Sequence, residues 1–182
     1  MPKTCACWSP KKNKTMWKCS LLGLVLFVSV WAKGQSPISA LPPYAQKPLP
    51  TYALLRTDST VVRSVDLPAY PYTLFVYFSP DCGHCQTEAE NLNAQMDSLQ
   101  NVLLVWVSYR DWQDIRRFYL QYNMARFPNV VMGRDPEYIL PSFFKVRFTP
   151  YVALYDKNKK FVKAWESGIA MSELLQLVRE KP

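Results

Sequence analysis

The sequence predicts one α/β domain built on a central mixed sheet. Two observations lead to this prediction. Apolar runs of strand length, at 73–78 and 102–107, alternate with stretches whose apolar residues recur at helical spacing, which is typical of a βαβ core. A later strand–turn–strand segment, 151–165, adds antiparallel strands to the parallel ones. The length of 182 residues suits a single domain and leaves little room for a second.

The domain is predicted to begin with a β-hairpin, because 52–56 and 60–63 are short strand-like segments around a turn-rich insert, 57–59. The run 73–78 is apolar without a break, which indicates a strand buried on both faces. A long helix should follow, because its apolar residues recur at intervals of four and three. These residues are Cys85, Ala89, Leu92, Met96 and Leu99.

The second half of the domain continues the alternation. The run 102–107 predicts another buried strand and 129–132 a short one. Asp111, with Asp114 three residues on, resembles a capping box that starts a helix. The predicted face of that helix is formed by Trp112, Ile115, Tyr119 and Tyr122.

The last elements are predicted from helix boundaries and turns. Asp135-Pro136 is a favourable helix start, and Pro141 should limit that helix to about one turn before a second short one. Two strands at 151–155 and 161–165 should form a hairpin. The final helix has its apolar face at Met171, Leu174, Leu175 and Val178.

Residues 1–34 are predicted to be a signal peptide. A basic stretch precedes the uncharged run 21–32, which suits the apolar region of a signal peptide and is short for a membrane span of ~20 residues. Ala32-Lys33-Gly34 offers small residues at the spacing for cleavage before Gln35. An uncleaved N-terminal anchor is the alternative, and Met16 is an alternative start. The cleaved signal peptide and the uncleaved anchor both place the domain outside the cytoplasm, and the periplasm after cleavage is the expected location.

The charge of the chain argues against a nucleic-acid partner. Six lysines and no acidic residue lie in 1–34, so this segment accounts for most of the net charge of +8. A nucleic-acid-binding protein should carry its basic patch on the folded domain, and here the rest of the chain is close to neutral. Residues 35–50 are rich in proline and are predicted to be an extended spacer, which leaves 51–182 as the domain.

The chemistry of the domain is predicted to lie at a C-x-x-C motif formed by Cys82 and Cys85. The motif directly follows a predicted buried strand and opens a helix, so Cys82 should lie where free N–H groups and the helix dipole stabilise a thiolate. Cys85 should be more buried and able to form a disulfide with Cys82. Gly83 permits close approach of another backbone. Asp81 and a protonated His84 should tune the thiolate in opposite directions.

Metal binding is a weaker hypothesis for this motif. Zinc takes four ligands, and the domain offers three Cys or His groups in one tight turn. A purely structural disulfide is also disfavoured, because so small a loop removes little entropy from the unfolded chain. We therefore expect no metal and no cofactor.

A family resemblance emerges from two separated motifs. The segment 78–85, Phe-Ser-Pro-Asp-Cys-Gly-His-Cys, at a strand–helix junction, followed by Thr149-Pro150 before a strand, resembles thioredoxin-fold proteins. The leader, the N-terminal hairpin and Glu88 after the motif resemble the extracytoplasmic TlpA/ResA-like thioredoxins over about residues 50–180. The resemblance implies a three-layer α/β/α fold around the mixed sheet.

The resemblance also implies roles for individual residues. Cys82 would be the attacking thiol and Cys85 the resolving one. Pro150 would be a cis-proline that faces the cysteine pair, and the backbone at Thr149 would pair with a substrate segment. Glu88 would be a proton acceptor beneath the cysteines, with an exposed charge on the helix as the open alternative.

The direction of electron flow stays open. The inner dipeptide Gly83-His84 matches that of protein disulfide isomerases, which are more oxidising than thioredoxin. Asp81 stands where a Trp is common, and its charge disfavours the thiolate and so favours the disulfide. The sequence therefore predicts a redox pair without fixing which way it works.

The resulting prediction is an extracytoplasmic thiol–disulfide oxidoreductase that reduces, forms or exchanges protein disulfides. Its partners would be protein thiols or disulfides and a further redox protein, with membrane contact only through an uncleaved leader. The alternative is a non-catalytic thioredoxin-fold module for binding or assembly in the cell envelope. Exposed aromatic residues would favour that alternative, and the candidates are Tyr44, Tyr70, Tyr72, Trp112 and Tyr122.

Overall fold

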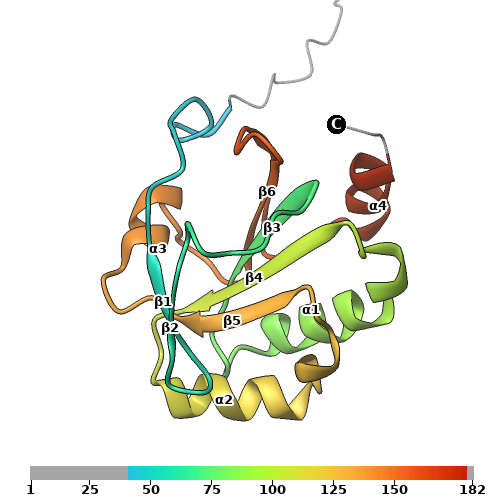
Figure 1. The fold of residues 1–182 in the computed structure, drawn as a ribbon. Helices are drawn as coiled ribbons and strands as arrows, with labels where there is room; N and C mark the ends of the chain where they lie inside the picture. The colour runs from blue at the N-terminus through green and yellow to red at the C-terminus, as the bar shows by residue number, and fades with distance from the viewer. Residues whose placement is uncertain (1–40, 180–182) are drawn as a thin grey trace, which may run out of the picture. The chain divides into compact units, whose positions relative to one another are not determined.

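The computed structural model describes residues 41–179, which form a seven-stranded mixed sheet with helices on both faces (Figure 1). The strands are β1 (Ala53–Arg56), β2 (Val61–Arg63), β3 (Tyr72–Tyr77), β4 (Val102–Ser108), β5 (Val130–Arg134), β6 (Tyr151–Asp156) and β7 (Phe161–Glu166). The helices are α1 (Gly83–Ala94), α2 (Trp112–Gln121), α3 (Ile139–Phe144) and α4 (Met171–Arg179), with 3₁₀ turns η1 (Met96–Ser98) and η2 (Met124–Arg126).

The strand order is β2-β1-β5-β4-β3-β6-β7, with β3 inside the sheet. Strands β3, β4 and β5 are parallel, whereas β6 runs antiparallel to β3 and carries β7 at its outer edge. Leu74 of β3 is level with Leu104 of β4 on one side and with Leu154 of β6 on the other. The predicted mixed sheet and the N-terminal hairpin β1–β2 are confirmed.

Two hydrophobic cores lie on opposite faces of the sheet. Alternate residues of β3 enter different cores, with Leu74 and Val76 in one and Phe75 and Tyr77 in the other. Helices α1, α2 and α4 contribute to the first core and α3 to the second, so the domain has three layers, α/β/α. Because both faces are covered, β3 and β4 are apolar apart from Thr73 and Ser108, as parallel strands in such folds mostly are.

The cysteine-bearing helix is shorter than its apolar pattern predicts. Helix α1 ends at Ala94, and η1 then carries the chain toward β4. All five residues of the predicted apolar face are nevertheless buried, because the 3₁₀ turn returns Met96 and Leu99 to the same core.

The start of α2 confirms one half of the predicted capping box. The Asp111 side chain accepts a hydrogen bond from the backbone N–H of Gln113 at 2.9 Å and so caps the helix. Asp114 does not complete the box, because its carboxylate pairs with Arg117 one turn further on. Phe118, absent from the predicted face, is buried in the core with Ile115.

The helix predicted to start at Asp135-Pro136 begins later, at Ile139. Asp135 is buried, and its carboxylate accepts from the backbone N–H of Leu140 at 2.8 Å. Pro141 lies in the first turn of α3, where a missing N–H costs no intrahelical bond. The prediction that Pro141 ends a helix is therefore wrong.

The predicted spacer is not wholly outside the core. Tyr44 is 2% exposed, and its ring lies 5.2 Å from that of Phe144 and 5.5 Å from that of Phe161. The many prolines of this segment gave no indication of a buried aromatic anchor. The predicted signal peptide, 1–34, lies outside the described residues. Within 41–179, no helix is long and apolar enough to cross a membrane.

None of the five candidate docking aromatics is fully exposed. Tyr44 and Tyr72 are buried, and Tyr70, Trp112 and Tyr122 are half-buried. The exposed aromatic residues of the described part of the chain are Tyr109, Tyr138 and Phe148.

Candidate active site

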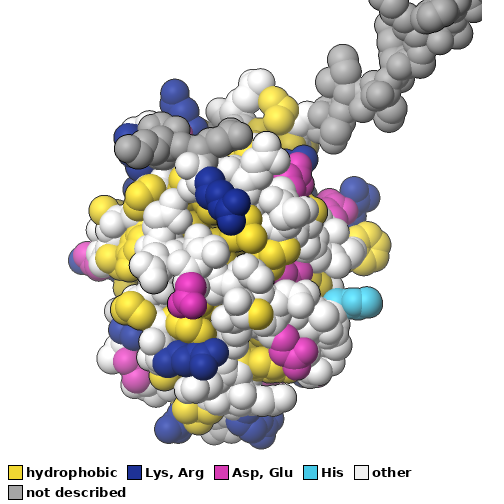
Figure 2. Space-filling model, turned by 90° about the vertical axis from the view of Figure 1, so that its right-hand side faces the viewer, with side chains coloured by type: hydrophobic (Ala, Val, Ile, Leu, Met, Phe, Trp, Pro, Cys, Tyr) yellow, Lys and Arg dark blue, Asp and Glu magenta, His cyan; other side chains and the backbone are white. Residues whose placement is uncertain are grey.

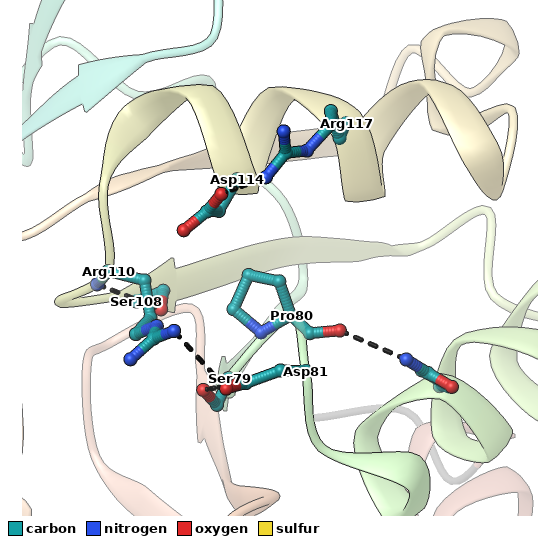
Figure 3. A network of polar contacts seen from close by, with 8 residues as sticks. Ser79, Pro80, Asp81, Ser108, Arg110, Asp114 and Arg117 are labelled. Carbon is teal, nitrogen blue, oxygen red and sulfur yellow. Dashed lines mark hydrogen bonds and ion pairs between the residues drawn. The ribbon is translucent and has the colours of Figure 1, made fainter.

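The C-x-x-C motif lies where β3 gives way to α1. Phe78 donates its backbone N–H to Val107 at 2.9 Å and so extends the pairing with β4 past the end of β3. The chain then turns, and the Cys82 backbone N–H donates to the Ser79 carbonyl at 3.1 Å. Gln86 of α1 holds the turn through a side-chain hydrogen bond to the Pro80 carbonyl at 3.1 Å (Figure 3). These bonds fix Cys82 as the N-cap residue of α1.

The two cysteines have different surroundings. Cys82 is half-buried and extended, with φ −87° and ψ 116°, and its side chain makes no capping bond to the helix. Cys85 lies inside the first turn and is fully buried. Both are free thiols. The arrangement leaves the Cys82 sulfur beside the first-turn N–H groups, which favour a negative charge.

The same asymmetry governs their acidity. Partial burial opposes ionisation of Cys82, but hydrogen bonds from the backbone N–H and the thiol of Cys85 outweigh it, so the pKa of Cys82 lies below its ordinary value. Burial, together with the neighbouring Cys82 sulfur, raises the pKa of Cys85 to about 12. Cys82 is thus the more readily ionised nucleophile.

The second predicted motif lies directly opposite the first. The Cys82 Sγ atom is 3.5 Å from the carbonyl oxygen of Thr149 and donates to it, across 67 residues of sequence. The Thr149–Pro150 bond is cis, as predicted. Pro150 is buried, and its carbonyl accepts from the Ser167 backbone N–H at 3.0 Å. The chain before β6 is therefore held against the cysteine pair.

Glu88 is buried, at 4% exposure, which overturns the alternative of an exposed helix charge. Its Oε2 atom accepts from the backbone N–H of Ile169 at 2.8 Å, whereas Oε1 has no hydrogen-bond partner among the described residues. Burial raises the pKa of Glu88, against the opposing effect of the Ile169 bond. Gly168 beside it has φ +133°, and a Cβ there would lie 3.2 Å from Oε2. Glycine is thus required for this approach.

Comparison with solved structures identifies the fold. A putative protein disulfide isomerase from Bacteroides thetaiotaomicron superposes with a TM-score of 0.60 and 15% identity, over 74% of this chain and 87% of that one. A secreted disulfide oxidoreductase of Mycobacterium tuberculosis, homologous to E. coli DsbE, superposes with a TM-score of 0.57 and 18% identity, over 70% of this chain and 94% of that one. A peroxiredoxin-like protein from Aquifex aeolicus superposes with a TM-score of 0.61 and 18% identity, over 74% of this chain and 85% of that one.

The chain has a thioredoxin fold. No protein-family model and no curated protein sequence matches it. The thioredoxin fold carries several chemistries, so the function has to be argued from the residues of the site.

Within this thioredoxin fold, Asp81 has partners that the sequence did not indicate. Its carboxylate accepts from the Ser79 hydroxyl and pairs with Arg110 Nη2 at 3.2 Å (Figure 3). The hydrogen bond from Ser79 has the larger effect and the charge of Arg110 a smaller one, and both hold the pKa of Asp81 below its usual range. Asp81 and Arg110 each follow one of two adjacent parallel strands, β3 and β4, and the carboxyl ends of such strands share an edge of the sheet. That proximity could be inferred from sequence, but the ion pair could not.

Gly83 and His84 lie at the surface of the thioredoxin fold. A Cβ on Gly83 would have no atom within 4 Å, so the fold itself does not require glycine there. His84 is exposed, and the histidine side chain projects from the surface in Figure 2. Their roles in substrate approach and thiolate tuning remain predictions.

The raised pKa of Glu88 predicts how the free energy of unfolding depends on pH. The folded protein binds the Glu88 proton more tightly than the unfolded chain does, for which the pKa is about 4.3. The free energy of unfolding should therefore fall as pH rises from that value through the raised folded-state pKa. Glu88→Gln should lack this fall, because its amide does not titrate. Its amide oxygen can still accept from Ile169, so the local contact is kept.

Urea unfolding at a series of pH values measures the effect. Glu90→Gln is the matched control, because Glu90 is exposed on the same helix. It should retain the wild-type pH dependence. If Glu88→Gln also retains it, the Glu88 carboxyl does not titrate in the buried position described here.

Proposed function

We propose that this protein is an extracytoplasmic thiol–disulfide oxidoreductase of the TlpA/ResA-like class that acts on protein disulfides. The observation that supports this most strongly is the placement of Cys82 Sγ at the N-terminus of α1, 3.5 Å from the Thr149 carbonyl, with Cys85 buried behind it. A nucleophile of low pKa and a partner of high pKa divide the attacking and resolving roles between them.

The reaction follows from this division. The Cys82 thiolate attacks one sulfur of a substrate disulfide; a Cys82–substrate disulfide forms and the other substrate sulfur leaves as a thiolate. Cys85 then loses its proton and attacks the Cys82 sulfur. The Cys82–Cys85 disulfide forms, and the second substrate thiolate is released. The substrate has gained two electrons and the cysteine pair has lost two; the reverse sequence forms a substrate disulfide.

The second step needs a proton acceptor, because burial opposes ionisation of Cys85. Glu88 lies three residues further along α1, so both side chains are on one face of the helix. Its Oε1 atom has no hydrogen-bond partner among residues 41–179 and would accept this proton through water. We assign Glu88 this role.

Substrate binding is assigned to the chain before β6. Thr149 is half-buried beside Cys82. An extended substrate segment would pair with the Thr149 backbone while its disulfide meets the Cys82 sulfur. Pro150 has no backbone N–H, so it adds no donor that would compete with the substrate segment for hydrogen bonds. The partners are protein disulfides or thiols and a further redox protein.

The location is proposed from the leader. A signal-peptide-like segment at 1–34 would deliver the domain to the periplasm. The secreted M. tuberculosis oxidoreductase has the same fold in an extracytoplasmic setting.

Insulin reduction tests the proposed activity. The full chain should accelerate the reduction of insulin by dithiothreitol, because each cycle of the cysteine pair cleaves an insulin disulfide. The reaction is followed as precipitation of the reduced insulin. A Cys82→Ser/Cys85→Ser chain retains the three leader cysteines and is the control; it should react no faster than dithiothreitol alone. An active control, or an inactive wild-type chain that is folded, would contradict the proposal.

A further inference from the structure

A carboxylate next to an attacking thiolate is unfavourable, and Asp81 directly precedes Cys82. A negative charge close to the sulfur disfavours ionisation of the thiol. The groups that set the pKa of Cys82 are, however, its burial, Cys85, Thr149 and the His84 backbone. The position of the Asp81 carboxylate explains how its charge is accommodated.

The Asp81 carboxylate and the Cys82 sulfur are drawn to opposite sides of β3. In the sheet, β3 lies between β4 and β6. Asp81 is held by Arg110, which follows β4, whereas the Cys82 sulfur contacts Thr149, which precedes β6. The Ser79 hydroxyl donates to Asp81 from within the active-site loop and adds a second tether. Two neighbouring residues thus direct their charged groups apart.

Arg110 is itself held in place for this contact. Its backbone N–H donates to the hydroxyl of Ser108, which is fully buried at the end of β4. Its guanidinium lies 6.0 Å from the centre of the Tyr109 ring. The other acid that faces it, Asp114, is already paired with Arg117 on α2 (Figure 3). Asp81 is therefore the acid left for Arg110 to bind.

The Asp81–Arg110 and Asp114–Arg117 ion pairs border a hollow of about 290 Å³ between the active-site loop and α2. The side chains of Arg110 and Asp81 are 37% and 64% exposed, so water and salt reach the pair. An exposed pair contributes little to folding stability. Because Asp81 directly precedes Cys82, the Asp81–Arg110 pair points to a role in the reaction instead.

We propose that Arg110 is a positioning residue, which holds the Asp81 carboxylate toward β4 and so keeps its charge from opposing the Cys82 thiolate. This inference rests on the proposed function, since it concerns the nucleophile of that reaction. Arg110 touches neither sulfur; it acts through Asp81. His84 on α1 adds its own charge when protonated, and Glu88 lies buried on the same helix.

The test is the rate at which iodoacetamide alkylates Cys82 in the reduced full chain, measured across pH by mass spectrometry of the Cys82 peptide. Below the titration midpoint, Arg110→Gln should lower this rate about threefold, the size expected for an exposed ion pair. In an Asp81→Asn chain the same substitution should have a smaller effect, because no carboxylate is released. Arg110→Lys should restore part of the rate, since it keeps the charge without the guanidinium fork.

Arg116→Gln is the matched control, because Arg116 is an exposed arginine of α2 that does not line this hollow and whose loss leaves the Asp114–Arg117 pair in place. It should leave the rate unchanged. High salt should shrink the Arg110→Gln effect, because it screens exposed charges. Urea unfolding of each variant separates loss of the thiolate from loss of the fold.

An equal effect of Arg110→Gln with and without Asp81 would show that Arg110 acts only through its own charge and would overturn the inference. An unchanged rate in Arg110→Gln would overturn it as well. Failure of the proposed function looks different: the wild-type Cys82 would then be no more reactive below neutral pH than an unperturbed cysteine.

Discussion

Replacing Cys85 by serine should stop turnover and leave substrate covalently attached to Cys82. The first step needs only the Cys82 thiolate, whereas release needs the buried Cys85 thiol to attack the Cys82 sulfur. Insulin reduction should fall to the rate with dithiol alone. In a separate mixture of the pre-reduced variant with insulin and no free dithiol, peptide mass spectrometry should find insulin joined to Cys82.

Cys82→Ser is the paired control. It removes the nucleophile and retains the leader cysteines, so it should be equally inactive but should hold no substrate through Cys85. If Cys85→Ser attaches nothing while the wild type is active, or if substrate is found on Cys85 in Cys82→Ser, the two roles are reversed.

The largest expected loss of stability comes from Phe78→Ala. Phe78 directly follows β3 and is fully buried, with its ring 4.7 Å from that of Phe118 and 5.3 Å from that of Trp106. Truncating such a side chain costs about 3–5 kcal/mol, because it leaves a cavity among groups that collapse only partly. The loss should also loosen the loop that leads to Cys82.

Urea unfolding measures the change. Phe148→Ala is the control, because Phe148 is 61% exposed near the same site; it should alter the free energy of unfolding by no more than about 0.5 kcal/mol. A Phe78→Ala protein that loses under about 1 kcal/mol would show that the packing between β3, β4 and α2 does not hold the site as described.

Features set by local pattern were largely predictable from the sequence. The uninterrupted apolar runs of β3 and β4 predicted strands covered on both faces, and both cores are present. The motif at a strand–helix junction predicted Cys82 at a helix N-terminus. The approach of Thr149 to Cys82 was expected only through the family resemblance, because nothing local links residues so far apart.

Features that depend on distant loops were not predictable. The burial of Glu88 depends on the backbone of Ile169, 81 residues away, and on the unusual conformation of Gly168. The sequence therefore left an exposed and a buried Glu88 equally open. Tyr44 was missed for a similar reason, since its site is made by rings of α3 and β7. The partners of Asp81 required knowledge of where the Arg110 side chain points.

The central claim is that Cys82 and Cys85 form a reversible redox pair. Equilibrating the full chain in glutathione buffers of graded potential, and quantifying the peptide that joins Cys82 to Cys85, tests it most directly. We expect reversible conversion of two thiols to one disulfide, with a midpoint between about −270 and −120 mV, the range of thioredoxin-like oxidoreductases. A pair that stays reduced, or stays oxidised, at every potential between those limits would contradict the claim.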